Sequence, residues 1–347
     1  MTVHAEPGAV QSPDAAGGAQ NDYRNSLRKG GFTGRILRLA VGLALGMLAG
    51  WYALRDTQLD EVWRLLASVA PSSVALSMLL VAATQPVKAL RWQAIAGGVV
   101  ALPFGRSLRG LLIGQALNLL MPFRAGDVAR AYLVGRQVSQ GTVFTFYTVL
   151  AEKALDVVML LASLILLLAW GPWPVWLSRP GIAAAVGAVV VTAAGLGGAW
   201  IWQQRSAPFG SRPAAGLRRR IEQRLIAPAG VLAQGLAAAR HDGRLIRMVV
   251  WSVVTWVLGW ATNLAVLWAL GLSVHWTAAL LILVAIYAGV VVPAPPARVG
   301  LWHFLVVLVL TSYGISQSPA MACGVLLHLV VVGPLLLAGG AAAWIKT

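Results

Sequence analysis

Residues 142–169 read "TVFTFYTVLAEKALDVVMLLASLILLLA", an apolar run long enough to cross a bilayer as one helix. Three charged residues, Glu152, Lys153 and Asp156, interrupt its first half. Glu152 and Asp156 are four residues apart and therefore share one helix face. A charged side chain at the bilayer centre costs about 2.5–3.5 kcal/mol, so it should face a partner or a watery cavity. The run predicts a transmembrane helix that carries a buried polar site.

The composition extends this prediction to the whole chain. Of its 347 residues, 59% are hydrophobic and only 11% are charged, and the mean hydropathy is +0.76. These values lie outside the range of soluble domains. At about 20 residues a span, the length predicts an all-α polytopic membrane protein with about eight transmembrane or re-entrant helices, plus a re-entrant segment near 105–135.

The apolar runs divide the chain into an arm and one membrane domain. Residues 1–30 show no apolar period and predict a disordered cytoplasmic arm, whereas 31–345 form a single integral membrane domain. The run at 35–54 predicts a first helix that stays as an uncleaved anchor, and its Gly42, Gly46 and Gly50 would allow close approach of a neighbouring helix. Further spans are predicted at 72–90, 142–169, 182–202, 246–270, 276–293, 299–314 and 320–345.

The charge pattern predicts the orientation. The formal net charge is +16, and the arginines gather in the N-terminal arm and in the loop 203–247 between the two halves. Cytoplasmic loops collect Lys and Arg, so both segments, and the C-terminus, are expected in the cytoplasm, with the chain in the cytoplasmic membrane. Binding of nucleic acid is not expected, but a site for anionic lipid on the loop is an alternative meaning of its charge.

The count of crossings requires two segments that enter the membrane and return. With both ends of the first half in the cytoplasm, 105–135 must either not cross or cross and return, and a re-entrant hairpin from the cytoplasm satisfies this count. In the second half, 276–314 is left to enter and return from outside. The second segment is broken at "VVPAPPARVG", residues 291–300. Two broken segments of opposite orientation are typical of transporters built from an inverted repeat. Two ordinary helical hairpins with polar loops would satisfy the same count.

The first of these segments contains "NLLMPFRAGDVARAYLV", residues 118–134. We expect it to dock against 142–169 through pairs between Arg124 or Arg130 and the carboxylates there. Pro122 and Gly126 favour a helix break whose free N–H groups attract anions, and Asn118 is suited to a freed backbone group or a head group. Either the arginines form an ion-pair network that only fixes the hairpin, or one of them holds a lipid phosphate.

The second segment places Pro293 and Pro296 before Arg298 and Gly300, which predicts that one helix stops and the next begins near the site. His303 follows, and His328 lies in the last predicted span. Either histidine is suited to a proton relay, although a lone histidine in a membrane segment more often forms a hydrogen bond between helices.

Several enzyme signatures are missing. The sequence has no H-E-x-x-H, P-loop, G-x-S-x-G or C-x-x-C pattern, and its only cysteine, Cys323, lies in an apolar run. No cofactor and no metal site are therefore predicted, and an ATP-driven pump is not expected.

The combined motifs resemble those of the lysylphosphatidylglycerol synthase transmembrane region family. That family shows N-x-x-x-P-x-R-x-G-E-x-x-R, then E-R-x-x-D, then P-x-x-P-G-x-x-G with Glu or His three residues on. Here the matching residues are Asn118, Pro122, Arg124, Gly126, Asp127, Arg130, Glu152, Lys153, Asp156, Pro293, Pro296, Gly300 and His303. Asp127, Lys153 and Ala297 depart from the usual Glu, Arg and Gly. The resemblance implies a flippase-like protein that handles lipids, without the cytosolic aminoacyl-transferase domain of the best-known relatives.

Together these features predict a transporter or flippase of polar or anionic lipids, in which the residues named above, with Arg298 and His328, bind lipid or form ion pairs. Protonation of Asp127, Glu152 or His303 would couple it to a proton gradient. The alternative is a membrane-embedded accessory subunit or transferase for lipid-linked glycans, with Asp127 or Glu152 as a base. The expected partners are membrane lipids, and the oligomeric state is left open.

Overall fold

The computed structural model describes residues 42–121, 124–170, 239, 242–289 and 295–344. Every regular element in these ranges is helical, which confirms the predicted all-α class. Four helices are long and apolar enough to cross a membrane: α3 (Pro71–Ala96), α6 (Gly141–Trp170), α10 (Arg244–Ala269) and α13 (Gln317–Trp344). They coincide with four of the predicted spans. The predictions for 1–30, 182–202 and most of 203–247 lie outside the described residues.

Two shorter helices precede α3. The first covers Gly42–Leu54, and α2 covers Leu59–Ser68. Between the first helix and α3 a loop with acidic residues would be expected, but Asp60 and Glu61 form the first turn of α2. Acidic side chains there stabilise a helix through its dipole. A helix of this length falls below what a membrane span needs, so hydropathy does not predict it.

The two segments that break the apolar pattern are helical hairpins. α4 (Phe104–Leu120) is followed by α5 (Ala125–Gly135), and α11 (Trp276–Gly289) is followed by a short 3-10 turn, η4 (Pro296–Arg298), and α12 (Leu301–Ser312). None of these four helices has the roughly 20 residues needed to cross a bilayer. The spans predicted at 276–293 and 299–314 are therefore the two arms of one hairpin. Their lengths support segments that enter the membrane and return.

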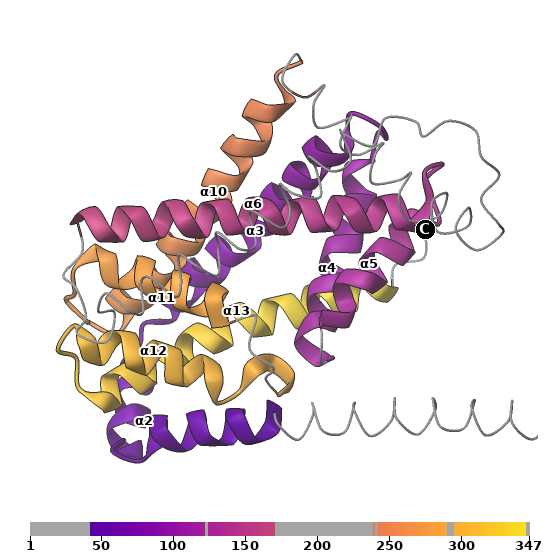
Figure 1. Ribbon diagram of the computed structural model, residues 1–347. Helices are drawn as coiled ribbons and strands as arrows, with labels where there is room; N and C mark the ends of the chain where they lie inside the picture. Colours follow the sequence, from indigo (N-terminus) through magenta and orange to yellow (C-terminus); the bar gives the residue numbers. More distant parts are fainter. Residues whose placement is uncertain (1–41, 122–123, 171–238, 240–241, 290–294, 345–347) are drawn as a thin grey trace, which may run out of the picture.

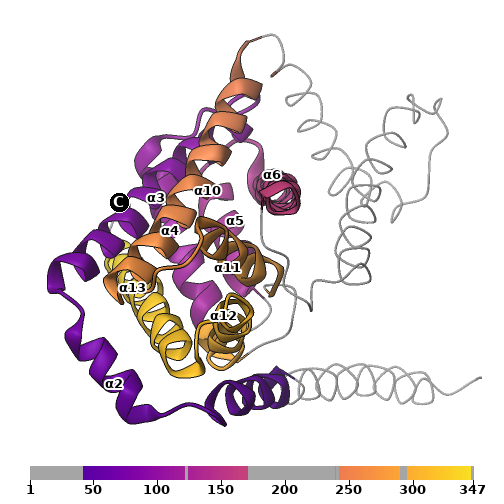
Figure 2. The same cartoon turned by 90° about the vertical axis from the view of Figure 1, so that its left-hand side faces the viewer.

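The order of elements repeats. A long helix, a hairpin and a long helix occur as α3, α4–α5 and α6, and again as α10, α11–α12 and α13. α3 packs along α10 and runs in the opposite direction, as both ribbon views show (Figures 1 and 2). α6 begins at the end of the molecule where α13 finishes, so these two are also opposed (Figure 1). This arrangement supports the inverted repeat.

Hydrogen bonds between distant segments define two ends of the molecule. At one end the Gln58 N–H donates to Ser318 Oγ over 3.0 Å, and the Tyr313 hydroxyl donates to Thr277 Oγ1 over 3.0 Å. At the other end Arg109 Nε donates to the Ala342 carbonyl over 2.9 Å. The loops at 55–58, 270–276 and 313–316 thus share one end, and those at 97–103 and 136–140 lie at the other.

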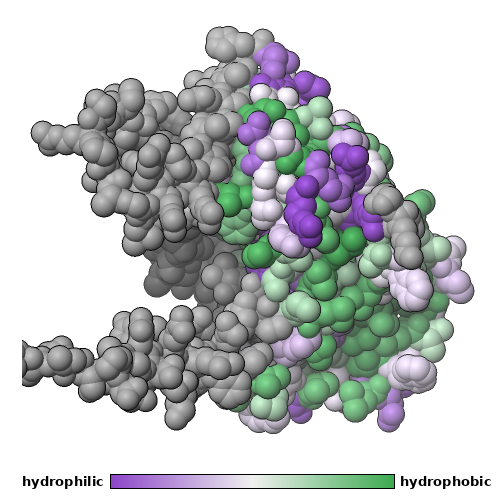
Figure 3. Space-filling model, turned by 90° about the vertical axis from the view of Figure 1, so that its right-hand side faces the viewer, coloured by the Kyte–Doolittle hydropathy of each residue, from purple (hydrophilic) through white to green (hydrophobic). Residues whose placement is uncertain are grey.

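The outer surface suits a bilayer. Large apolar side chains such as Leu79, Ile165 and Leu337 are exposed on the long helices. On the side where α4 and α5 lie in Figure 1, apolar side chains cover most of the lower part of the described surface, whereas polar side chains gather above them (Figure 3). In water such exposed apolar area would be costly, but it is favourable against lipid chains.

Candidate functional site

Arg91 of α3 holds the two carboxylates of α6 together. Its Nη1 lies 2.7 Å from Asp156 Oδ1 and its Nη2 lies 3.1 Å from Glu152 Oε1. The Arg91 side chain is only 1% exposed. Two carboxylates on one helix face repel each other unless a cation lies between them. Arg91 supplies that cation and fixes α3 to α6.

Arg130 of α5 completes the network. Its Nη2 lies 2.8 Å from Glu152 Oε2, so each oxygen of Glu152 has its own arginine. The guanidinium also stacks over the Trp92 ring at 4.5 Å, a cation–π contact. Trp92 is itself held, because its indole N–H donates to Thr148 Oγ1 over 2.9 Å. The first hairpin is thus docked on α3 and α6 through one buried arginine.

The break between α4 and α5 is closed by polar contacts. Asn118 donates from Nδ2 to Asp127 Oδ1 over 3.1 Å and accepts the Asp127 backbone N–H over 3.2 Å. Gly126 lies against α4, and a methyl group there would collide with the Gly114 carbonyl. Of the two arginines expected to pair with α6, Arg130 does so, whereas Arg124 Nε lies 3.4 Å from Asp127 Oδ2 on its own hairpin.

The break in the second hairpin has an unusual backbone. Ala297 and Arg298 both adopt left-handed conformations, with φ of 53° and 55°, as does Arg124 at the first break, with φ of 54°. His328 of α13 supports this turn, because its Nε2 donates to the Ala297 carbonyl over 2.9 Å. The His303 ring packs on His328 at 5.1 Å between centroids. His328 therefore contacts the turn directly, and His303 contacts His328.

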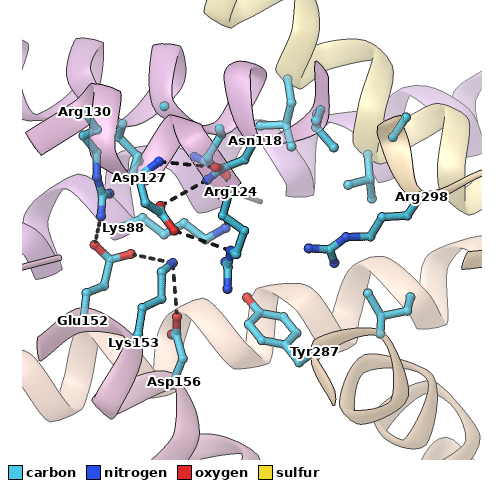
Figure 4. A pocket seen from close by; sticks show the side chains of 18 of the residues that line it. Lys88, Asn118, Arg124, Asp127, Arg130, Glu152, Lys153, Asp156, Tyr287 and Arg298 are labelled. Atoms are coloured by element: carbon cyan, nitrogen blue, oxygen red, sulfur yellow. Dashed lines mark hydrogen bonds and ion pairs between the residues drawn. The ribbon is translucent and has the colours of Figure 1, made fainter. Parts of the chain in front are cut away.

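Both breaks meet at one cavity of about 330 Å³, which we call the charged cavity. Figure 4 shows Arg124, Arg298 and Tyr287 pointing into the same space from three sides. Six basic and three acidic side chains of the described residues line it: Lys88, Arg91, Arg124, Arg130, Lys153 and Arg298, with Asp127, Glu152 and Asp156. Positive charge is in excess, and no ion-pair partner of the Arg298 guanidinium occurs among the residues that the structure describes.

The structure brings together most of the predicted site residues, but not all of them. Asn118 also lines the charged cavity, whereas Pro296, Gly300, His303 and His328 do not. Gly300 instead packs against the first helix, where a methyl group would collide with the Gly46 carbonyl. Gly46 and Gly50 thus allow a close approach, although their neighbour is the turn before α12. Pro122 and Pro293 lie outside the described residues.

Sequence reasoning missed the residues that α3 and α11 contribute. Lys88 lies in the cavity wall with its Nζ 3.5 Å from Gln115 Oε1, and Tyr287 faces the cavity from α11. Lys88 was a detectable signal, because a lysine inside an apolar run needs a partner as much as Glu152 does. Arg91 lies just beyond the predicted span 72–90, whereas α3 continues to Ala96.

These features define a class: a helical membrane protein in which two broken hairpins meet at a buried, positively charged cavity. The sequence profile of the Lysylphosphatidylglycerol synthase TM region family matches residues 39–339. The chain belongs to this family, which confirms the resemblance of the motifs and makes it a membrane protein of lipid-related processes. A search of curated proteins finds no match to this chain.

Proposed function

We propose that the protein binds the anionic head group of a membrane lipid in the charged cavity and moves that lipid between the leaflets of the cytoplasmic membrane. The observation that carries the proposal is the Arg298 guanidinium, which faces Arg124 across the cavity (Figure 4). Two cations that share a cavity repel each other, and an anion between them removes the repulsion. A phosphate matches the planar guanidinium with paired hydrogen bonds.

The rest of the network leaves these two arginines available. Arg91 and Arg130 are each within 3.1 Å of a carboxylate, and Glu152 has no free oxygen to offer a third arginine. Arg124 has only the longer contact of 3.4 Å to Asp127, and 41% of its side chain is exposed. The buried ion pairs thus form the wall of the cavity, and Arg124 and Arg298 are the arginines that can bind the head group.

The position of the cavity suits transport. Its walls come from both halves of the repeat, since Arg124 belongs to the first hairpin and Arg298 to the second. In transporters built from inverted repeats, one half rocks against the other around a site near the midplane. A volume of about 330 Å³ has room for a polar head group but not for two lipid chains, which would stay in the bilayer.

Leaflet exchange in liposomes tests the proposal. The protein is reconstituted with phosphatidylglycerol that carries a fluorophore on one chain, and dithionite then quenches the outer leaflet. Wild-type protein should expose more of the label than protein-free liposomes do. Arg298→Gln should slow exchange about tenfold or more, because one charge-assisted hydrogen bond is worth about 1.5–3 kcal/mol.

The matched control is Arg55→Gln, which removes an arginine from an exposed pair with Asp56 and should leave the rate unchanged. The same label on phosphatidylcholine, whose choline cancels the charge of its phosphate, should move more slowly, because the cavity has an excess of positive charge. If folded wild-type protein moves neither lipid faster than empty liposomes do, the proposal of transport fails. If Arg298→Gln and Arg55→Gln behave alike, the assignment of the head group to this cavity fails.

A further inference from the structure

A second hollow lies on the described part of the molecule, and it differs in character from the charged cavity. Its volume is about 870 Å³. Its walls come from α6, α10, α11 and the connection before α11: Met159, Ala162, Ser163, Leu166, Val253, Trp256, Val257, Trp260, Leu264, Trp268, Val274, Trp276 and Leu280. Ser163 is the one member with a hydroxyl group, and four members are tryptophans. We call it the tryptophan groove.

The tryptophan groove begins where the charged cavity ends. On α6, Leu160 lines the cavity and its neighbour Met159 lines the groove. At the junction, the ring of Trp256 in the groove packs against the ring of Tyr287 in the cavity, with centroids 4.8 Å apart. One aromatic pair thus separates a positively charged hollow from an apolar one.

The junction also has a polar group without a partner. The Trp256 side chain is buried, and its indole N–H has no hydrogen-bond acceptor among the described residues. A buried N–H without an acceptor costs about 1–3 kcal/mol, so a lipid gains that energy if the ester carbonyl between its head group and its chain lies at this point. The far side of the groove is open, because Val257 is 50% exposed and Trp268 is 70% exposed. On a membrane protein such an opening faces lipid chains.

We propose that the tryptophan groove holds one hydrocarbon chain of the same lipid whose anionic head group occupies the charged cavity. This inference rests on the proposed function and adds a chain-binding site to it. A lipid has a charged head group with apolar chains attached to it. The charged cavity matches the head group, and the adjoining tryptophan groove matches a chain. From residue 159 to residue 166 the groove follows α6 for about 10 Å, which suits part of one acyl chain.

Photochemical labelling in lipid nanodiscs tests this proposal. Two probes are used: phosphatidylglycerol with a diazirine in the middle of one acyl chain, and phosphatidylglycerol with a diazirine on its head group. The chain probe should label residues 159–166 and 253–268, and the head-group probe should label residues around Arg124 and Arg298. Mass spectrometry of the digested protein locates both labels.

Two variants distinguish labelling by a bound lipid from labelling by the surrounding bilayer. Arg298→Gln should lower groove labelling by the chain probe at least about fivefold, because the head group no longer holds the lipid there. Ala162→Phe, at an exposed position in the groove wall, should lower groove labelling while the head-group label stays within about twofold of wild type. The matched control is Ala82→Phe, which is exposed on α3 and lines neither hollow.

The outcomes distinguish the two proposals. If the groove is labelled equally in wild type and Arg298→Gln, or equally by phosphatidylcholine carrying the same chain diazirine, bulk lipid fills it and the chain-binding site is refuted. If the head-group probe labels nothing around Arg124 and Arg298, the proposed function itself fails. Comparable melting temperatures of all four proteins would show that lost labelling is not lost folding.

Discussion

At the scale of single residues, Glu152 is a buried carboxylate that pairs with two arginines at once. It is 3% exposed, and its two oxygens accept from Arg91 and Arg130. Removal of one partner from a buried ion pair leaves a charge without compensation, at a cost of about 3–5 kcal/mol. We expect Glu152→Gln to lower the free energy of unfolding by that amount, measured by chemical denaturation in detergent.

Asp56→Asn is the comparison for this change, because Asp56 pairs with Arg55 on the exposed surface, where ion pairs are worth about 0–1 kcal/mol. Its unfolding curve should match that of wild type. Equal stability of Glu152→Gln and Asp56→Asn would mean that the arginines find other partners, and the network would lose its structural role.

The left-handed backbone at Ala297 gives a prediction of opposite sign. Ala297 has φ of 53°, a conformation that costs a residue with a Cβ about 1–2 kcal/mol and costs glycine almost nothing. Ala297→Gly should therefore raise stability by about 1 kcal/mol, seen as a higher melting temperature. In Ala129→Gly, within α5, the same substitution should instead lower stability by about 1 kcal/mol. A loss in both variants would contradict the strained turn.

His328 is expected to act on lipid through Arg298, as a positioning residue. Its hydrogen bond of 2.9 Å to the Ala297 carbonyl fixes the turn from which Arg298 extends. His328→Phe keeps an aromatic ring but removes the donor, so exchange of anionic lipid should slow while the melting temperature changes little. His328→Gln supplies an amide donor and should restore part of the rate. A merely structural role for His328 would lower both quantities together.

Residue types and their spacing predicted part of the site, and the reason is physical. Arg124, Arg130, Glu152 and Asp156 are conspicuous because a charge inside an apolar run needs compensation. Which charges pair was not predictable, since Arg91 reaches Glu152 from a helix that is 61 residues away in the chain. Side-chain packing between helices decides such pairs, and a single sequence carries no record of it.

At the scale of elements, the first hairpin depends on the close approach of its arms. A methyl group on Gly126 would meet the Gly114 carbonyl and would lie 2.7 Å from the Asn118 backbone nitrogen. Backbone atoms cannot move aside as a flexible side chain can, so Gly126→Ala should cost about 1–3 kcal/mol. Thermal unfolding in detergent measures the loss.

Gly105→Ala is the control within the same hairpin. Gly105 lies in the first turn of α4 and has open space around the position of a Cβ. Alanine is favoured over glycine in a helix by about 0.5–1 kcal/mol, so this variant should be slightly more stable than wild type. If Gly126→Ala also gained stability, α4 and α5 would be farther apart than the structure shows.

At the same scale, hydropathy predicted the long helices but did not identify the short ones. α3, α6, α10 and α13 fall on predicted spans, because a membrane-crossing helix needs a long apolar run and the sequence states that directly. Hydropathy alone makes the arms of the second hairpin resemble two spans, since apolar residues continue almost to Pro293 and resume at Gly300, and the count of crossings was needed to predict that 276–314 enters and returns. Length distinguishes an arm from a span only when both helix ends are known.

At the scale of the whole molecule, the two ends differ in charge. Among the described residues, the end that contains the loops 97–103 and 136–140 carries Arg106, Arg109, Arg136, Arg244 and Arg247 with Asp242. The opposite end carries Asp56, Asp60 and Glu61 with Arg55 and Arg64. Positive residues remain on the cytoplasmic side of a membrane, so we expect the arginine-rich end to face the cytoplasm.

Cysteine labelling tests this orientation, because the native Cys323 is buried and gives an unreactive background to reagents in water. Ser139 and Ser316 are both exposed, and they lie at opposite ends of the molecule. A maleimide that cannot cross membranes should label Ser316→Cys in intact cells and Ser139→Cys only after the membrane is opened. The reverse pattern would invert the topology and place the entrance of the first hairpin outside. Equal labelling of both in intact cells would contradict an arrangement in which α3, α6, α10 and α13 all cross the membrane.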